Sequence, residues 1–139
     1  MDVKFIIAGI AIFLISLIGG IVFHGILLHN DYGQIPNLMR TDTEAMGYLP
    51  FMMASHLIKG FAFVWIYKKG LEPGIPALTQ GLKFGVATVF LVTVPLYLVY
   101  YSVQPMPGML VVKQILSDSF VMVLAGVVVS MIIKPPANA

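Results

Sequence analysis

Four long apolar runs, separated by shorter polar segments, make up most of the chain. They extend over residues 5–28, 49–67, about 81–101 and 110–133. At about 1.5 Å per residue, the first run reaches roughly 36 Å as an α-helix, which exceeds the ~30 Å hydrocarbon core of a bilayer. The runs are apolar on all sides, whereas a helix of a soluble protein keeps a polar face. The pattern therefore predicts four transmembrane α-helices.

Composition supports an all-α membrane protein. Of the 139 residues, 59% are hydrophobic and only 10% are charged, whereas soluble domains carry about 25% charged residues. The length fits a single domain, so we predict one four-helix transmembrane domain over residues 1–139. The run from Phe5 to Leu28 is longer than the apolar core of a signal peptide, about 7–15 residues, and no small-residue cleavage site follows it. We expect it to be a retained helix.

The connections between the runs are short enough to join neighbouring antiparallel helices, which predicts an up-down-up-down bundle. Such a bundle places two groups of positive residues on opposite sides of the membrane. One side receives Lys4, Lys68, Lys69, Lys83 and Lys134, and the other receives Arg40 and Lys113. Since cytoplasmic loops carry the excess of positive charge, both termini are expected in the cytoplasm.

Two local signals refine this picture. Residues Thr41 to Glu44 have the spacing of a capping box, so a short surface helix is expected to begin there, with apolar residues that favour the membrane surface. Pro95 lies inside the third run and should kink it, because proline lacks the N–H that an α-helix requires.

Polar residues inside the runs are the candidate functional residues, because ionisable groups within a membrane usually mark a site. They gather in the non-cytoplasmic half and are His24, His56, Lys59, Thr93, Tyr97, Gln114 and Asp118. Counting at ~1.5 Å per residue, Lys59 lies roughly 13 Å and Asp118 roughly 12 Å below the same surface. We therefore predict an ion pair between them and a polar pocket that opens outward.

Each feature also has a structural explanation. The Lys59–Asp118 pair could lock the helix register or serve as a proton or substrate site. His24 and His56 could hold haem b or be satisfied interior histidines. No structural zinc site is expected, since the chain has no cysteine and no third and fourth ligand candidates with metal spacing. Two motifs of small residues predict close helix packing: Gly81 with Gly85, and Gly126 with Ser130.

One stretch resembles a known group of proteins. It runs from Val94-Pro95-Leu96-Tyr97 through Gln104-Pro105-Met106-Pro107-Gly108 to Lys113-Gln114-Ile115 and Asp118. It is similar to small uncharacterised bacterial inner-membrane proteins. The resemblance implies four helices and a multi-pass protein of the bacterial inner membrane, and it implies no activity.

Three functions are compatible with the sequence. The first is a non-enzymatic small subunit or accessory protein of a membrane complex, since no catalytic set is found. The second is a small oligomeric transporter or channel that uses the buried Lys, Asp and His residues. The third is a di-histidine haem protein. Expected partners are the lipid bilayer and other membrane subunits or further copies of the chain. A net charge of +2 without a Lys/Arg cluster argues against nucleic acid.

Overall fold

The computed structural model describes residues 2–137. Met1, Asn138 and Ala139, the ends of the predicted domain 1–139, lie outside the described residues. The described part is helical and contains no strand. Its long helices are formed by α1 (Val3–Gly20) with the π-helix Ile21–Leu27, α4 (Leu49–Lys69), α5 (Ala77–Thr88) with the π-helix Val89–Thr93 and α6 (Val94–Val103), and α7 (Gly108–Ile132). Shorter helices are α2 (His29–Tyr32), a 3-10 turn at Pro36–Leu38, and α3 (Asp42–Gly47).

Four helices of this part of the chain are long and apolar enough to cross a membrane. They span Val3–Leu27, Leu49–Lys69, Ala77–Val103 and Gly108–Ile132. The four predicted helices are thereby confirmed as helices, and each lies within about one turn of its predicted bounds. A short helix that begins after Thr41 is confirmed as well. The side chain of Thr41 accepts from the backbone N–H of Glu44, and the side chain of Glu44 accepts from the backbone N–H of Thr41, which completes a capping box at the start of α3.

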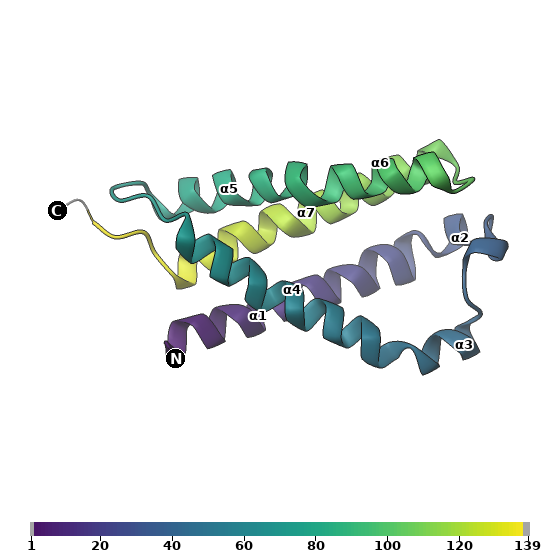
Figure 1. The fold of residues 1–139 in the computed structure, drawn as a ribbon, viewed down its shortest axis with the longest axis horizontal. Coiled ribbons are helices and arrows are strands. Elements are labelled where there is room, and N and C mark those ends of the chain that lie inside the picture. Colours follow the sequence, from purple (N-terminus) through teal and green to yellow (C-terminus); the bar gives the residue numbers. More distant parts are fainter. Residues whose placement is uncertain (1, 138–139) are drawn as a thin grey trace.

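The bundle has two distinct ends (Figure 1). The N-terminus, the start of α5 and the C-terminal segment lie at one end, which we call the terminus end. Helices α2 and α3 and the turn from α6 to α7 lie at the other, the loop end. At the terminus end, Gly74 takes φ 75°, a left-handed conformation suited to glycine, and its N–H donates to the carbonyl of Pro136.

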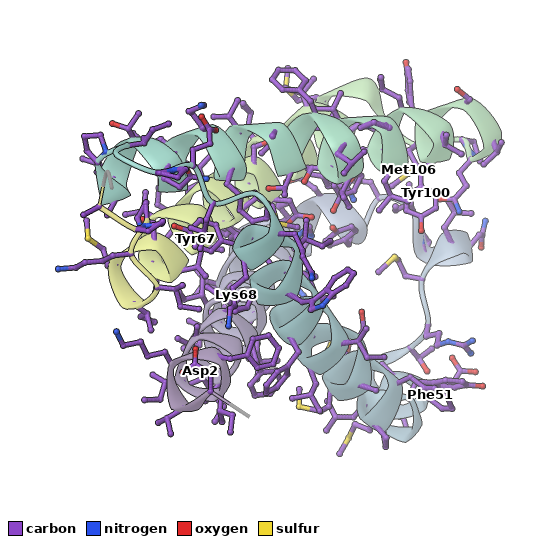
Figure 2. The ribbon with its side chains drawn as sticks, turned by 60° about the vertical axis from the view of Figure 1, so that its left-hand side comes forward. Asp2, Phe51, Tyr67, Lys68, Tyr100 and Met106 are labelled. Carbon is purple, nitrogen blue, oxygen red and sulfur yellow. The ribbon has the colours of Figure 1, made fainter. Side chains whose placement is uncertain are left out.

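The order of packing gives α1 a central place. Helix α1 packs against both α4 and α7, and α5 packs along α7. Beyond its packing on α1, helix α4 contacts α5 near the terminus end, where Phe63 and Tyr67 meet the ring of Phe84. At the loop end α4 diverges, so that Phe51 stands apart from Tyr100 on α6 (Figure 2).

The apolar core fills the terminus half. Its most buried members are Ala8, Ile12, Val64, Tyr67 and Val129. Tyr67 is fully buried, and its hydroxyl donates to the carbonyl of Ile133 at 3.1 Å, which satisfies the one polar atom of that side chain.

Helices α5 and α7 approach each other through the two small-residue motifs of the sequence. A Cβ at Gly85 would lie 2.8 Å from the Cα of Val123, and one at Gly126 would lie 2.8 Å from the Cα of Gly85. Gly81 faces Ser130 and the carbonyl of Gly126. Since any side chain at the glycines would collide with the opposite backbone, these residues set the interhelical distance.

Two π-helical segments interrupt the long helices. One covers Ile21–Leu27 and carries His24, and the other covers Val89–Thr93, directly before Pro95. Proline removes the N–H that would otherwise bond to the carbonyl of Leu91, and a π segment is one way for a helix to absorb that loss. The predicted break at Pro95 thus takes the form of a local change of helix type.

Candidate functional site

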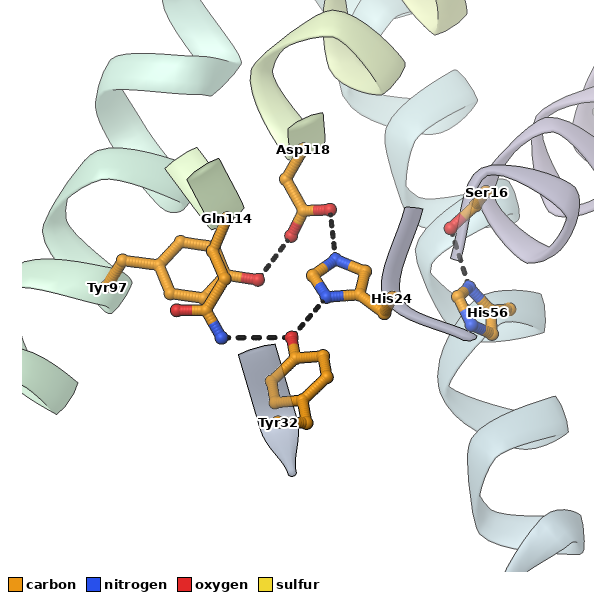
Figure 3. Close-up of polar contacts among 7 residues, drawn as sticks. All are labelled: Ser16, His24, Tyr32, His56, Tyr97, Gln114 and Asp118. Carbon is orange, nitrogen blue, oxygen red and sulfur yellow. Dashed lines mark hydrogen bonds and ion pairs between the residues drawn. The ribbon is translucent and has the colours of Figure 1, made fainter. Parts of the chain in front are cut away.

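Asp118 lies at the centre of a hydrogen-bond network in the loop half (Figure 3). Its Oδ1 is 2.9 Å from Nε2 of His24, and its Oδ2 accepts from the hydroxyl of Tyr97 at 2.7 Å. His24 comes from the π segment that extends α1, and Tyr97 comes from α6. One carboxylate therefore joins three of the four long helices.

A second part of the network approaches His24 from α2. The hydroxyl of Tyr32 is 2.6 Å from Nδ1 of His24, and the side-chain amide of Gln114 donates to that hydroxyl at 3.0 Å. Gln114 is 4% exposed and lies one helical turn before Asp118 on α7. The network therefore continues without a break from Gln114 to Tyr97.

With a neutral imidazole, the network has a single consistent direction. Gln114 donates to Tyr32, the Tyr32 hydroxyl donates to Nδ1 of His24, and Nε2–H donates to Asp118, which also accepts from Tyr97. This direction requires the Nε2–H tautomer of His24. Every ring nitrogen and both carboxylate oxygens then have a partner.

A protonated imidazole reverses one part of this order. Nδ1–H would then donate to Tyr32, whose own hydroxyl proton requires a new acceptor. The side-chain oxygen of Gln114 is buried and has no hydrogen-bond partner within residues 2–137. Turning the Gln114 amide over would present this oxygen to Tyr32. The same five side chains can thus hold the site with or without an added proton.

An ion pair fixes α2 on α7 beside the network. Nζ of Lys113 lies 2.8 and 2.9 Å from the two carboxylate oxygens of Asp31, the residue before Tyr32. Leu28 and Ile35 flank this segment and pack with Leu110 of α7 in a small buried cluster. The ion pair and the cluster together position the Tyr32 hydroxyl over His24.

The order Tyr32, His24, Asp118 has the form of a nucleophile, a base and an orienting acid. Burial, however, raises the pKa of the Tyr32 phenol, so this hydroxyl stays protonated. The bond from Gln114 also occupies the oxygen that would have to attack a substrate. The arrangement is better suited to passing a proton than to covalent catalysis.

The predicted ion pair between Lys59 and Asp118 is wrong. Asp118 is held by His24 and Tyr97, and Lys59 has no carboxylate within 4.0 Å in the described part of the chain. The physical reason is the packing order: Asp118 lies on α7, and α1 stands between α7 and α4, which carries Lys59. Equal depth in the bundle did not make the two helices neighbours.

His56 lies away from the network, against α1 (Figure 3). Its Nδ1 is 2.6 Å from the hydroxyl of Ser16, which is 5% exposed. His24 has both ring nitrogens in hydrogen bonds, so haem ligation would require one of them to break. Residues 2–137 contain no group of three or more His, Cys, Asp or Glu side chains placed to hold a metal ion.

The structure thus brings together four of the predicted polar residues: His24, Tyr97, Gln114 and Asp118. Thr93 is buried at 3% exposure, one turn before Tyr97, and makes no side-chain hydrogen bond within the described range. Sequence reasoning missed Tyr32 and Ser16. Tyr32 sits in a connection, where nothing in the pattern distinguishes it, and Ser16 is a single uncharged polar residue within an apolar run.

Comparison with the models of known protein families, with curated proteins and with solved structures finds no match to this chain.

Proposed function

We propose that this chain is a small proton-linked transporter of the bacterial inner membrane that binds its proton at His24 and Asp118. The observation that carries the proposal is the 2.9 Å contact between these two side chains, which come from different membrane-length helices. Ionisable residues in such helices are costly and are commonly retained for function.

A transporter fits the surroundings of the site better than an open channel does. The network lies in the loop half, where the side chains of His24 and Asp118 are 26% and 34% exposed. The terminus half is closed by apolar residues such as Ile12, Val64 and Val129. In the proposed cycle, protons reach the site from the loop end in this conformation, and release at the other end requires the helices to move.

The orientation follows from charge. Five lysines lie in the segments at or next to the terminus end: Lys4, Lys68, Lys69, Lys83 and Lys134. Under the positive-inside rule, we therefore propose that both termini are in the cytoplasm and that the site lies toward the outside. The bacterial inner membrane is inferred from the resemblance described above. Four helices enclose little space for a transport path, so self-association is part of the proposal. We propose no enzymatic activity, because Tyr32 is a neutral, occupied hydroxyl.

The test is proton movement in proteoliposomes. The purified chain is reconstituted in vesicles with a pH-sensitive dye inside, and a potassium diffusion potential is applied. We expect proton uptake that is lost in Asp118→Asn and in His24→Gln, and retained in the control Asp42→Asn, whose carboxylate lies on α3. Equal uptake in the wild type, in both variants and in empty vesicles would contradict the proposal.

A second candidate function is supported by the divergence of α4. At the loop end α4 diverges from the rest of the bundle, and large side chains such as Phe51 and Ile58 stay exposed. An accessory subunit of a membrane complex would use this surface against a neighbouring helix. Native gel separation of mildly solubilised membranes distinguishes the two functions, since only a subunit migrates with a large complex.

A further inference from the structure

His56 and Lys59 form a second polar site, which lies on α4 and is separate from the hydrogen-bond network around Asp118. The two residues are three positions apart on one helix, so their side chains share a face. Both are partly buried, and both lie in a membrane-length helix. This second site does not depend on proton binding by His24 and Asp118, and it therefore goes beyond the proposed function.

In the tautomer in which Ser16 donates to Nδ1, His56 presents an unused donor at Nε2. Ser16 is hydrogen-bonded to Nδ1 at 2.6 Å, and a serine hydroxyl that donates to Nδ1 leaves the proton on Nε2. In the described range, Nε2 has no hydrogen-bond partner. It lies beside Gly20 of α1, where an added Cβ would be 3.6 Å from it. The absence of a side chain at Gly20 keeps this edge of the imidazole open.

Lys59 presents an unused positive charge. It makes no hydrogen bond or ion pair with residues 2–137, and the carboxylate of Asp118 already has a donor on each oxygen. A charge in an apolar environment is stabilised only by an opposite charge or by water. The Lys59 cation, and the His56 N–H three positions before it on α4, thus lack the acceptor that both require.

We infer that His56 and Lys59 bind the carboxylate of a monoanionic ligand that has an apolar body. One fixed positive charge is matched by one negative charge, and the two carboxylate oxygens suit two donors. Lys59 is about 15 Å along α4 from its start at Leu49, which is deeper than lipid headgroups usually lie. Exposed Leu57 and Ile58 on the same helix offer apolar contact for the rest of the ligand.

Two sources can supply this chemistry: a long-chain fatty acid that enters from the bilayer, or a short carboxylate from the aqueous side. Binding to the full-length protein in a neutral detergent separates them. Oleate and butyrate are the probes, and methyl oleate is the uncharged control. If oleate binds and butyrate does not, the bilayer is the source of the ligand. If butyrate binds as well, the aqueous side is the source. Either result supports the site.

The variants test which residues bind the carboxylate. We expect Lys59→Met to weaken oleate binding roughly 30-fold, since it removes one partner of a desolvated charge pair. Lys59→Arg should keep most of the affinity, and Lys69→Met, at the end of α4, is the matched control. Thermal unfolding of each variant verifies that it is folded. The inference would be overturned if Lys59→Met bound oleate as tightly as the wild type does, or if the wild type bound methyl oleate as tightly as oleate.

Discussion

Nε2 of His24 lies 2.9 Å from Oδ1 of Asp118, and this contact joins the first long helix to the last. The two residues are 94 positions apart in the chain. Tyr97 on the other carboxylate oxygen adds α6, so the network both holds the loop half together and places a titratable pair inside it. The side chains to which we assign proton binding therefore also hold helices together. Measurements of stability test the second role apart from the first.

We expect Asp118→Ala to lower the free energy of unfolding by about 1–3 kcal/mol, because it leaves the donors of His24 and Tyr97 without an acceptor. In a double-mutant cycle with His24→Ala, the loss of stability in the double variant should be about 1 kcal/mol smaller than the sum of the losses in the two single variants. Denaturant unfolding in detergent micelles measures both. Strictly additive losses would show that the contact contributes nothing to stability.

The ion pair between Lys113 and Asp31 should order α2 more than it stabilises the whole protein. The lysine side chain is 43% exposed, so Lys113→Met is expected to cost less than about 1 kcal/mol of global stability. Backbone amides of residues 29–33 should nevertheless exchange faster with deuterium, since α2 loses its fixed contact to α7. Lys134→Met is the matched control, and equal exchange in the two variants would assign the order of α2 to its apolar cluster alone.

The close approach of α5 and α7 predicts a large effect from a single methyl group. Gly126→Ala would place a Cβ 2.8 Å from the Cα of Gly85, and the helices would have to separate, at a cost of about 1–3 kcal/mol. The control is Gly25→Ala, because a Cβ at Gly25 meets nothing within 4 Å. A melting temperature that falls as far for Gly25→Ala as for Gly126→Ala would contradict this role.

Features that depend on a short stretch of chain were predictable from the sequence. The apolar runs gave the four helices, because length and hydropathy are local properties. The Thr41–Glu44 spacing predicted the start of α3 for the same reason. The motifs at Gly81 and Gly126 marked surfaces able to pack closely, although not the helix that each would meet.

Features that depend on which helices are neighbours were not predictable. Counting residues placed Lys59 and Asp118 at one depth, yet depth says nothing about the central position of α1 between their helices. The 2.6 Å contact between Ser16 and His56 likewise depends on the packing of α4 on α1, which no local pattern reveals. Tyr32 reaches the network only because α2 folds back onto α7, and that fold is set by contacts between residues distant in sequence.

The capping box of α3 predicts a local response to acid. The backbone N–H and the hydroxyl of Thr41 donate to the carboxylate of Glu44 at 3.0 and 2.9 Å and hold its pKa below the usual value. The contribution of a carboxylate with a lowered pKa is fully present above its unfolded value, about 4.3, and is lost as the pH falls through the folded value. The protection of the amides of residues 42–47 against exchange, taken relative to the intrinsic rate at each pH, should therefore fall below about pH 4. Glu44→Gln keeps an acceptor for Thr41 without a charge, so its exchange should lose this pH dependence. An acid response of equal size in Glu44→Gln would assign the effect to Asp42, the other acidic residue in the first turn.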